Sequence, residues 1–70
     1  MKIWVYQPRN APDPRLYRHF LDAYQAMEYD NGMTFEEILE DDPDADWGGS
    51  EEEGYFYIDD GGSIELVEVK

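Results

Sequence analysis

The chain has 70 residues, 41% of them hydrophobic, no cysteine and a formal net charge of −13 at pH 7. The hydrophobic share favours a folded protein over a disordered one, and the length predicts a single domain, residues 1–70, with a small core, since such a chain buries only about 60% of its unfolded surface. The lack of cysteine excludes a disulfide framework and a thiolate zinc site, and so much negative charge argues against direct binding to nucleic acid or to an anionic membrane.

The first half of the chain predicts a strand followed by a long helix. Residues 2–7 (KIWVYQ) are rich in β-branched and aromatic side chains and end at Pro8, which is typical of a strand. Asp13 and Pro14 are residue types that favour the N-cap and the first position of a helix. Over residues 14–29 the main apolar side chains fall within an arc of about 160° on a helical projection. We therefore expect a helix over residues 14–29 that packs on a sheet.

The second half predicts a short helix and a hairpin. Thr34 and Glu37 have the spacing of a capping box, so a helix is expected from there to about Glu40. Strands are expected over residues 54–60 and 63–69, because the glycines between them can supply the positive φ angles of a tight hairpin. The predicted fold is α+β, a three-stranded, mainly antiparallel sheet with one long and one short helix in β-α-α-β-β order. The sequence leaves open whether the first strand joins the hairpin parallel or antiparallel.

Negative charge is concentrated in the second part of the chain. Residues 1–27 carry four basic and two acidic side chains, a balance of +2, whereas residues 28–70 carry sixteen acidic side chains and one basic, a balance of −15. The densest run is DDPDADWGGSEEE, residues 41–53, with seven carboxylates in thirteen positions. Such asymmetry says more about binding partners than about the fold.

The run over residues 41–53 partly matches the ligand spacing of a calcium-binding EF-hand loop. Its sixth position, where such a loop needs glycine for a sharp turn, is Trp47, whose side chain makes a positive φ costly. We therefore expect no specific metal site, only weak and diffuse attraction of divalent cations. The matching ligand positions are Asp42, Asp44, Asp46, Ser50 and Glu53.

Groups suited to catalysis are scarce. The chain has one histidine, His19, and its hydroxyl side chains other than tyrosine are Thr34, Ser50 and Ser63. Carboxylate pairs for glycoside hydrolysis can be drawn from the acids in many ways and so carry no information, and a domain of this size offers little wall for a substrate cleft. We expect no enzymatic activity and no cofactor.

The acidic part of the chain predicts a surface for binding rather than for solubility alone. About 2 to 8 net charges keep a small domain soluble, and further charge destabilises the compact state. The acids are interleaved with Trp47, Tyr55 and Tyr57, which are side chains that protein interfaces favour. In an extended chain the run would place a carboxylate about every 6 Å. Together with the acids of the short helix and the hairpin, it reaches a charge density comparable to that of duplex DNA, which carries a phosphate about every 3.4 Å along each strand. The predicted partner-binding residues are Glu36, Glu37, Glu40, Asp41, Asp42, Asp44, Asp46, Trp47, Glu51, Glu52, Glu53, Tyr55, Asp59 and Asp60.

Size, charge, lack of cysteine and the acidic, aromatic segment 36–60 resemble the small inhibitors encoded by phages and mobile elements, the anti-CRISPR and antirestriction proteins that act as DNA mimics. The resemblance rests on no aligned motif. It implies a stoichiometric inhibitor, acting as a monomer, that blocks the DNA-binding or PAM-reading site of a host defence complex such as CRISPR-Cas. The alternative is an acidic interaction module or an antitoxin that masks one basic partner protein.

The sequence gives no sign of a membrane span or an export signal. Its longest apolar runs are about four to six residues, far below the roughly 20 that cross a bilayer, and its start, MKIWVYQPRN, lacks the apolar region of a signal peptide. We therefore expect a soluble, cytoplasmic protein.

Overall fold

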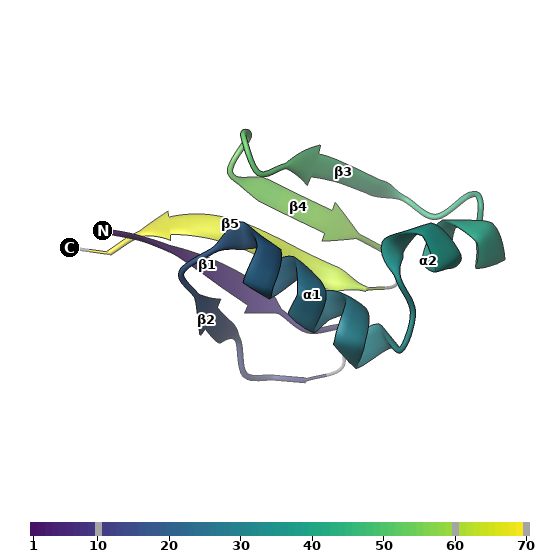
Figure 1. Ribbon diagram of the computed structural model, residues 1–70, viewed down its shortest axis with the longest axis horizontal. Coiled ribbons are helices and arrows are strands. Elements are labelled where there is room, and N and C mark those ends of the chain that lie inside the picture. Colours follow the sequence, from purple (N-terminus) through teal and green to yellow (C-terminus); the bar gives the residue numbers. More distant parts are fainter. Residues whose placement is uncertain (10, 60, 70) are drawn as a thin grey trace.

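The computed structural model describes residues 1–9, 11–59 and 61–69. In chain order its elements are β1 (Lys2–Gln7), β2 (Arg15–Tyr17), α1 (Phe20–Asn31), α2 (Phe35–Asp41), β3 (Trp47–Ser50), β4 (Tyr55–Ile58) and β5 (Gly62–Glu68) (Figure 1). The strands form one antiparallel sheet in the order β2-β1-β5-β4-β3, so β2 and β3 are its edges.

The prediction of a three-stranded sheet is wrong, because the sheet has two further strands at its edges. β2 lies within the residues predicted as the start of the long helix, and β3 lies within the acidic run. Each pairs with a strand that is already part of the sheet, β2 with β1 and β3 with β4. Tertiary pairing therefore overrides the local signals at both places, as it commonly does for short segments.

β1 lies between β2 and β5 and is antiparallel to both, which answers the question that the sequence left open. Trp4 is opposite Tyr17 on one side and opposite Leu66 on the other. Side chains alternate along a strand, so buried Trp4 and Tyr6 point to one face of the sheet and Val5 points to the other.

β4 and β5 form a hairpin in which Ile58 is opposite Gly62. Gly62 has a φ of 108°, and a Cβ atom there would lie 2.6 Å from the carbonyl oxygen of Gln7. Only glycine meets both conditions without strain, which explains this residue at the start of β5. Asp60, a residue of the predicted turn and of the predicted binding surface, lies outside the described residues.

The long helix, α1, begins later than predicted, at Phe20 rather than at Pro14. Its N-cap is His19, which makes no side-chain capping hydrogen bond, and the predicted cap at Asp13 is wrong because the residues that follow it pair with β1 instead. The helix ends at Asn31 and is capped by Gly32, whose φ of 68° is the left-handed conformation that glycine adopts readily at a helix C-terminus.

The short helix, α2, has the predicted capping box. The Thr34 hydroxyl accepts a hydrogen bond from the Glu37 backbone N–H at 3.2 Å, and the Glu37 carboxylate accepts one from the Thr34 N–H at 3.1 Å. These bonds satisfy two N–H groups that a helix terminus otherwise leaves unpaired. Neither helix of the described chain is long and apolar enough to span a membrane.

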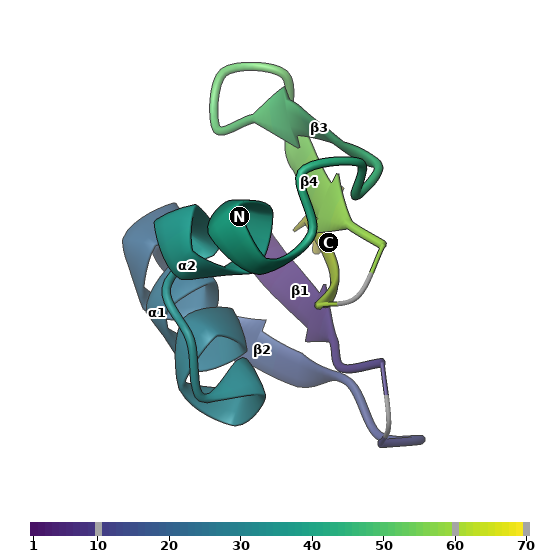
Figure 2. The same cartoon turned by 90° about the vertical axis from the view of Figure 1, so that its right-hand side faces the viewer.

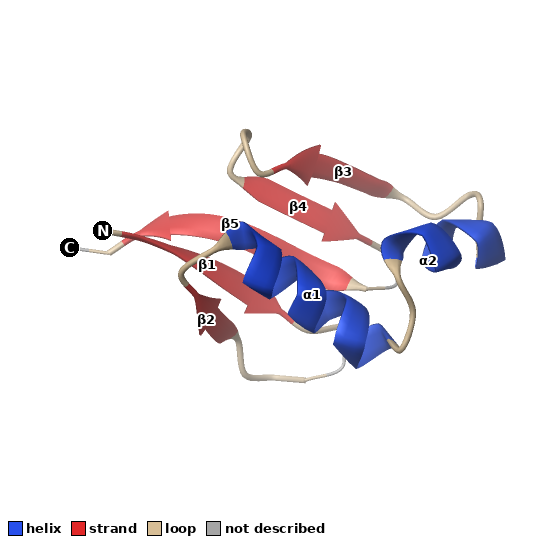
Figure 3. Ribbon diagram, in the orientation of Figure 1, coloured by secondary structure: helices blue, strands red, loops and turns tan. Residues whose placement is uncertain are grey.

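The two helices pack on one face of the sheet, so the described part of the chain has two layers (Figures 2 and 3). Phe20 of α1 makes edge-to-face contacts with Trp4 at 5.0 Å and with Phe56 at 6.3 Å between ring centroids. The aromatic rings therefore join α1 to both β1 and β4. The buried core consists of Trp4, Tyr6, Ala23, Met27, Ile38, Phe56, Ile58 and Ile64.

Candidate functional site

The fold distributes the predicted acidic surface over different elements (Figure 1). Seven of its carboxylates lie on α2 and on residues 42–46, and we call them the α2–linker acids: Glu36, Glu37, Glu40, Asp41, Asp42, Asp44 and Asp46. Three lie in the turn between β3 and β4, and we call them the turn acids: Glu51, Glu52 and Glu53. Of the other predicted residues, Trp47 lies in β3, Tyr55 in β4 and Asp59 directly after β4.

The acids of α2 differ in what they do for the helix. Glu36 and Glu37 lie in its first turn, where the helix dipole favours negative charge. Glu40 and Asp41 lie at the opposite end, where the dipole disfavours negative charge, and the last turn holds no basic residue. All four side chains are exposed. The charges of Glu40 and Asp41 therefore do not help to stabilise α2.

The linker after α2 leads directly into the sheet. The Asp46 carbonyl oxygen accepts a hydrogen bond from the Asp59 N–H at 2.8 Å, and the Asp46 carboxylate accepts one from the Tyr57 hydroxyl at 3.4 Å. Asp44 is exposed and Asp42 is partly buried. The run over residues 41–53 is thus not one extended loop, because its first residue belongs to α2 and its middle residues are paired as β3.

The turn acids lie on a tight turn. The Glu53 N–H donates to the Ser50 hydroxyl at 3.3 Å, and the Gly54 N–H donates to the Glu51 carbonyl oxygen at 3.2 Å. A hydrogen bond with the Glu53 carboxylate raises the pKa of the Tyr55 hydroxyl. The turn lies at the end of β3 away from α2 (Figure 1), and the four residues of β3 span about 13 Å. The acids therefore form two groups, one before β3 and one after it.

The residues with EF-hand spacing do not form a loop around a single metal-binding position. Asp46 precedes β3 and Glu53 follows it, so the strand separates two of the matching ligand positions. Among the residues that the structure describes, no three His, Asp or Glu side chains gather closely enough to hold a metal ion.

The two aromatic residues of the predicted site face opposite sides of the sheet. Trp47 is opposite Ile58 and points to the helices, and its ring packs edge to face on Phe35 of α2 at 5.0 Å between centroids. Nevertheless 48% of Trp47 is exposed. Tyr55 is opposite Glu65 and points away from the helices. Trp47 is therefore both a packing residue for α2 and an accessible part of the surface.

Sequence reasoning missed the surface that surrounds Tyr55. We call the face of the sheet that points away from the helices the open face. The alternation of β5 was the available signal, since buried Ile64 implies that Glu65 and Val67 point to the opposite side. The apolar, aromatic and acidic side chains on the open face are Ile3, Val5, Leu16, Tyr55, Tyr57, Glu65 and Val67.

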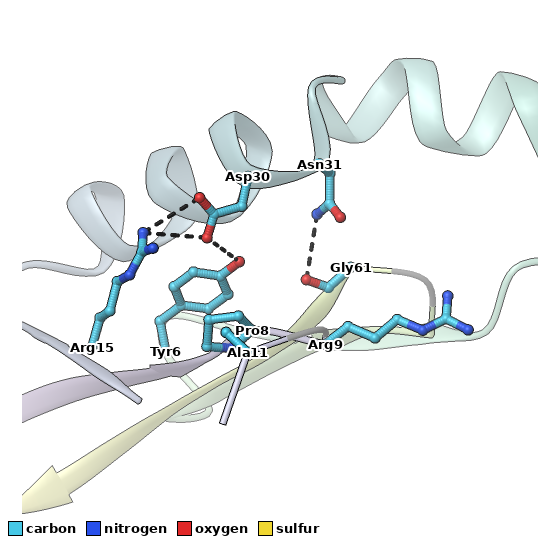
Figure 4. A pocket seen from close by; sticks show the side chains of 8 residues that line it. All are labelled: Tyr6, Pro8, Arg9, Ala11, Arg15, Asp30, Asn31 and Gly61. Carbon is cyan, nitrogen blue, oxygen red and sulfur yellow. Dashed lines mark hydrogen bonds and ion pairs between the residues drawn. The ribbon is translucent and has the colours of Figure 1, made fainter. Parts of the chain in front are cut away.

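A pocket of about 220 Å³ lies at the other side of the molecule, between β1, β2 and the end of α1 (Figure 4). The buried Tyr6 hydroxyl donates to the Asp30 carboxylate at 3.0 Å, and the Arg15 guanidinium contacts both Asp30 oxygens at 3.3 Å. Burial, with this hydrogen bond, raises the pKa of Tyr6 to about 12. In the described chain every buried side-chain nitrogen or oxygen has a hydrogen-bond partner, so the pocket presents no unsatisfied buried group to a ligand.

Two of the groups considered for catalysis take part in local hydrogen bonds. His19 is exposed at the N-cap of α1. The hydroxyls of Thr34 and Ser50 each accept a hydrogen bond from a backbone N–H three residues later. These contacts give both hydroxyls a role in ending or starting an element.

A comparison with models of known protein families, with curated proteins and with solved structures found no match. The function of this chain therefore has to be inferred from its own charge and geometry.

Proposed function

We propose that this protein is a stoichiometric inhibitor of the anti-CRISPR or antirestriction type, whose α2–linker acids and turn acids mimic DNA. It occupies the DNA-binding or PAM-reading site of a host defence complex such as CRISPR-Cas, as a monomer in the cytoplasm. The observation that carries the proposal is the exposed charge of Glu40, Asp41 and Asp44. Two of these carboxylates oppose the dipole of α2, so selection for stability does not account for them.

The spacing of the two acidic groups supports the proposal. They lie at opposite ends of β3, so at least the length of this strand, about 13 Å, separates them along the chain. Two separate groups of carboxylates can take the place of phosphates at two points along a duplex. A net charge of −13 also attracts a basic site over a distance and raises the rate of association.

Recovery of the target followed by DNA competition tests the proposal. The tagged protein is used to isolate partners from a bacterial lysate, and duplex DNA is then added. We expect a DNA-binding complex that releases the protein as duplex is added, with binding that weakens steeply as salt increases. Binding that duplex DNA does not displace would contradict DNA mimicry.

Matched charge removal locates the active surface. The variant Glu40→Gln/Asp41→Asn/Asp44→Asn removes three exposed carboxylates from the α2–linker acids. The control Asp13→Asn/Asp22→Asn/Glu68→Gln removes three exposed carboxylates elsewhere. We expect the first variant to block DNA from the complex several-fold less well and the control to act nearly as wild type. Equal potency of the two variants would show that only the net charge matters.

The alternative is an acidic module or antitoxin that masks one basic protein, and exposed Trp47 favours it. Aromatic side chains that are accessible before binding tend to become the central contacts of protein interfaces. In that case Trp47→Ala weakens binding by about 2 kcal/mol and duplex DNA does not compete. The same affinity measurement with and without DNA therefore separates the two functions.

A further inference from the structure

The open face of the sheet is a second surface with its own chemistry. α1 and α2 both lie on the other side of the sheet (Figure 2). The pairing registers place Leu16, Val5, Glu65, Tyr55 and Ser50 in one row across all five strands. This row runs from an apolar side chain at the β2 edge, through a carboxylate on β5, to a tyrosine on β4.

The exposure of these side chains makes the face accessible. Leu16 is 63% exposed, Tyr55 45% and Val67 39%. Glu65 is also exposed, and it lies between the apolar part on β1 and β2 and the tyrosines on β4. A partner that covers this face would remove apolar surface from water on both sides of one carboxylate.

The two tyrosine rings of the open face lie against glycines of β3. A Cβ atom at Gly48 would lie 3.1 Å from the Tyr57 ring, and one at Gly49 would lie 2.7 Å from the Tyr55 ring. The glycines of β3 thus leave room for the rings to lie against the edge strand. Both rings therefore pack on the backbone of the edge strand while part of Tyr55 stays exposed to a partner.

Carboxylates surround the tyrosine rings. The Tyr57 hydroxyl donates to Asp46 at 3.4 Å, and the Glu53 carboxylate raises the pKa of the Tyr55 hydroxyl. Glu65 is directly opposite Tyr55 on the next strand. An aromatic ring beside a carboxylate is the combination that binds an arginine side chain, whose flat guanidinium stacks on the ring and donates two hydrogen bonds to the carboxylate.

Charge also decides which partner can occupy the face. None of the described strand residues that point to the open face is basic. A second copy of this chain would bring another net charge of −13 and is repelled, as are nucleic acid and an anionic membrane. Addition of a strand to the β3 edge is disfavoured because Gly49, with a φ of 91°, interrupts its regular backbone.

We propose that the open face binds an arginine-bearing segment of a basic partner protein, with an arginine between Glu65 and the Tyr55 ring. This contact goes beyond the α2–linker acids, and it rests on the proposed function only in taking the partner to be basic. It adds a side-chain-specific contact to an attraction that is otherwise set by charge alone.

A titration with short cationic peptides tests the proposal. Acetylated, amidated tetra-arginine is the probe, and tetra-lysine of equal charge is the comparison. Four extended residues span about 13 Å, which reaches across three strands spaced about 4.8 Å apart. Amide shifts in ¹H–¹⁵N spectra at low salt give both the affinity and the location. We expect the largest shifts at Tyr55, Glu65 and their neighbours, and tighter binding of arginine than of lysine.

Two residues of β5 provide a matched pair of variants. Glu65 points to the open face, whereas Glu68 is opposite Lys2 and points to the helix side, and both are exposed. Glu65→Gln should weaken tetra-arginine binding about threefold, whereas Glu68→Gln changes it little. Tyr55→Leu keeps the charge and should abolish the preference for arginine over lysine. Thermal melts of each variant verify that the fold is intact.

Equal effects of Glu65→Gln and Glu68→Gln, or shifts concentrated on α2 and residues 42–46, would overturn the open-face proposal. These results would leave the proposed DNA mimicry standing, because that function depends on the α2–linker acids. Conversely, a protein that fails to compete with DNA but keeps the Glu65-dependent arginine preference would overturn DNA mimicry and support the open face.

Discussion

The ends of the two helices show two uses of acidic residues. At the end of α1, the Glu28 carboxylate accepts a hydrogen bond from the Phe35 N–H at 2.7 Å, and Asp30 binds Tyr6 and Arg15. At the end of α2, the last turn is equally acidic, and neither helix has a basic residue in its last turn. Both positions oppose a helix dipole, but among the residues that the structure describes only the α1 acids have side-chain contacts that compensate for it. The α1 acids therefore serve folding, and the α2 acids are available to a partner.

The two tryptophans extend this comparison and give the largest expected effect. Trp4 is 6% exposed and packs under α1, whereas Trp47 is 48% exposed and packs against α2. Trp4→Ala should cost about 3 to 5 kcal/mol of unfolding free energy, because it leaves a cavity in the core. Trp47→Ala should cost only about 1 to 2 kcal/mol, because half of its surface is already in water. Urea denaturation of both variants measures the difference, and equal losses would show that the α2 side is as structural as the α1 side.

Removal of single acids tests the same difference between the acids of α1 and the α2–linker acids, with smaller expected effects. Asp30→Ala leaves the buried Tyr6 hydroxyl without its acceptor, which should cost about 1 to 3 kcal/mol. Asp44→Ala removes an exposed charge from the α2–linker acids and should leave the midpoint of urea unfolding unchanged or slightly higher. In a Tyr6→Phe background the cost of Asp30→Ala should shrink, because no hydroxyl is left unsatisfied. A cost that stays the same would mean that Asp30 acts through Arg15 alone.

The sequence predicts the parts of this fold that local chemistry determines. The capping box at Thr34 and Glu37 is confirmed, because its two hydrogen bonds join residues three positions apart. The two edge strands could not be predicted in the same way. Arg15–Tyr17 carries a helix-start signal and Trp47–Ser50 contains two glycines, and both become strands only through partners in β1 and β4. Pairing between distant segments is not encoded in either segment alone.

The candidate site also has a part that the sequence predicts and a part that depends on strand pairing. The exposed acids of α2 follow from composition, whereas the open face depends on which strands are neighbours. Glu65 and Tyr55 are ten residues apart in the sequence and become a pair only through the register of β4 and β5.

Titration with alkali tests the contact between Tyr6 and Asp30 at the end of α1. Burial, followed by the hydrogen bond to Asp30, raises the pKa of Tyr6 to about 12, above the value of about 10 in an unfolded chain. The neutral hydroxyl is thus favoured in the folded state, so its stabilisation is complete below about pH 10 and is lost as the pH rises towards about 12. Urea midpoints from about pH 9 to pH 12 should fall less steeply in Tyr6→Phe than in wild type. Some slope remains, because burial also raises the pKa of Tyr24.

The smallest expected effect is the response of thermal stability to salt. Its sign shows whether repulsion among the α2–linker acids or the attraction between Arg15 and Asp30 is the larger effect. Salt screens the repulsion among the α2–linker acids, which raises the melting temperature, and it screens the attraction between Arg15 and Asp30, which lowers it. The repulsion involves seven carboxylates, whereas the single, partly exposed ion pair of Arg15 and Asp30 contributes little to stability.

We therefore expect the melting temperature to rise by a few degrees between about 20 mM and about 300 mM NaCl, over which the Debye length falls through about 10 Å at 0.1 M. The variant Glu40→Gln/Asp41→Asn/Asp44→Asn should melt higher at low salt and respond less to added salt than wild type. The control Asp13→Asn/Asp22→Asn/Glu68→Gln removes as many charges and should keep more of the wild-type response. A melting temperature that falls with salt would mean that the α2–linker acids are too far apart to repel one another, and it would remove the electrostatic reason for assigning them to a partner.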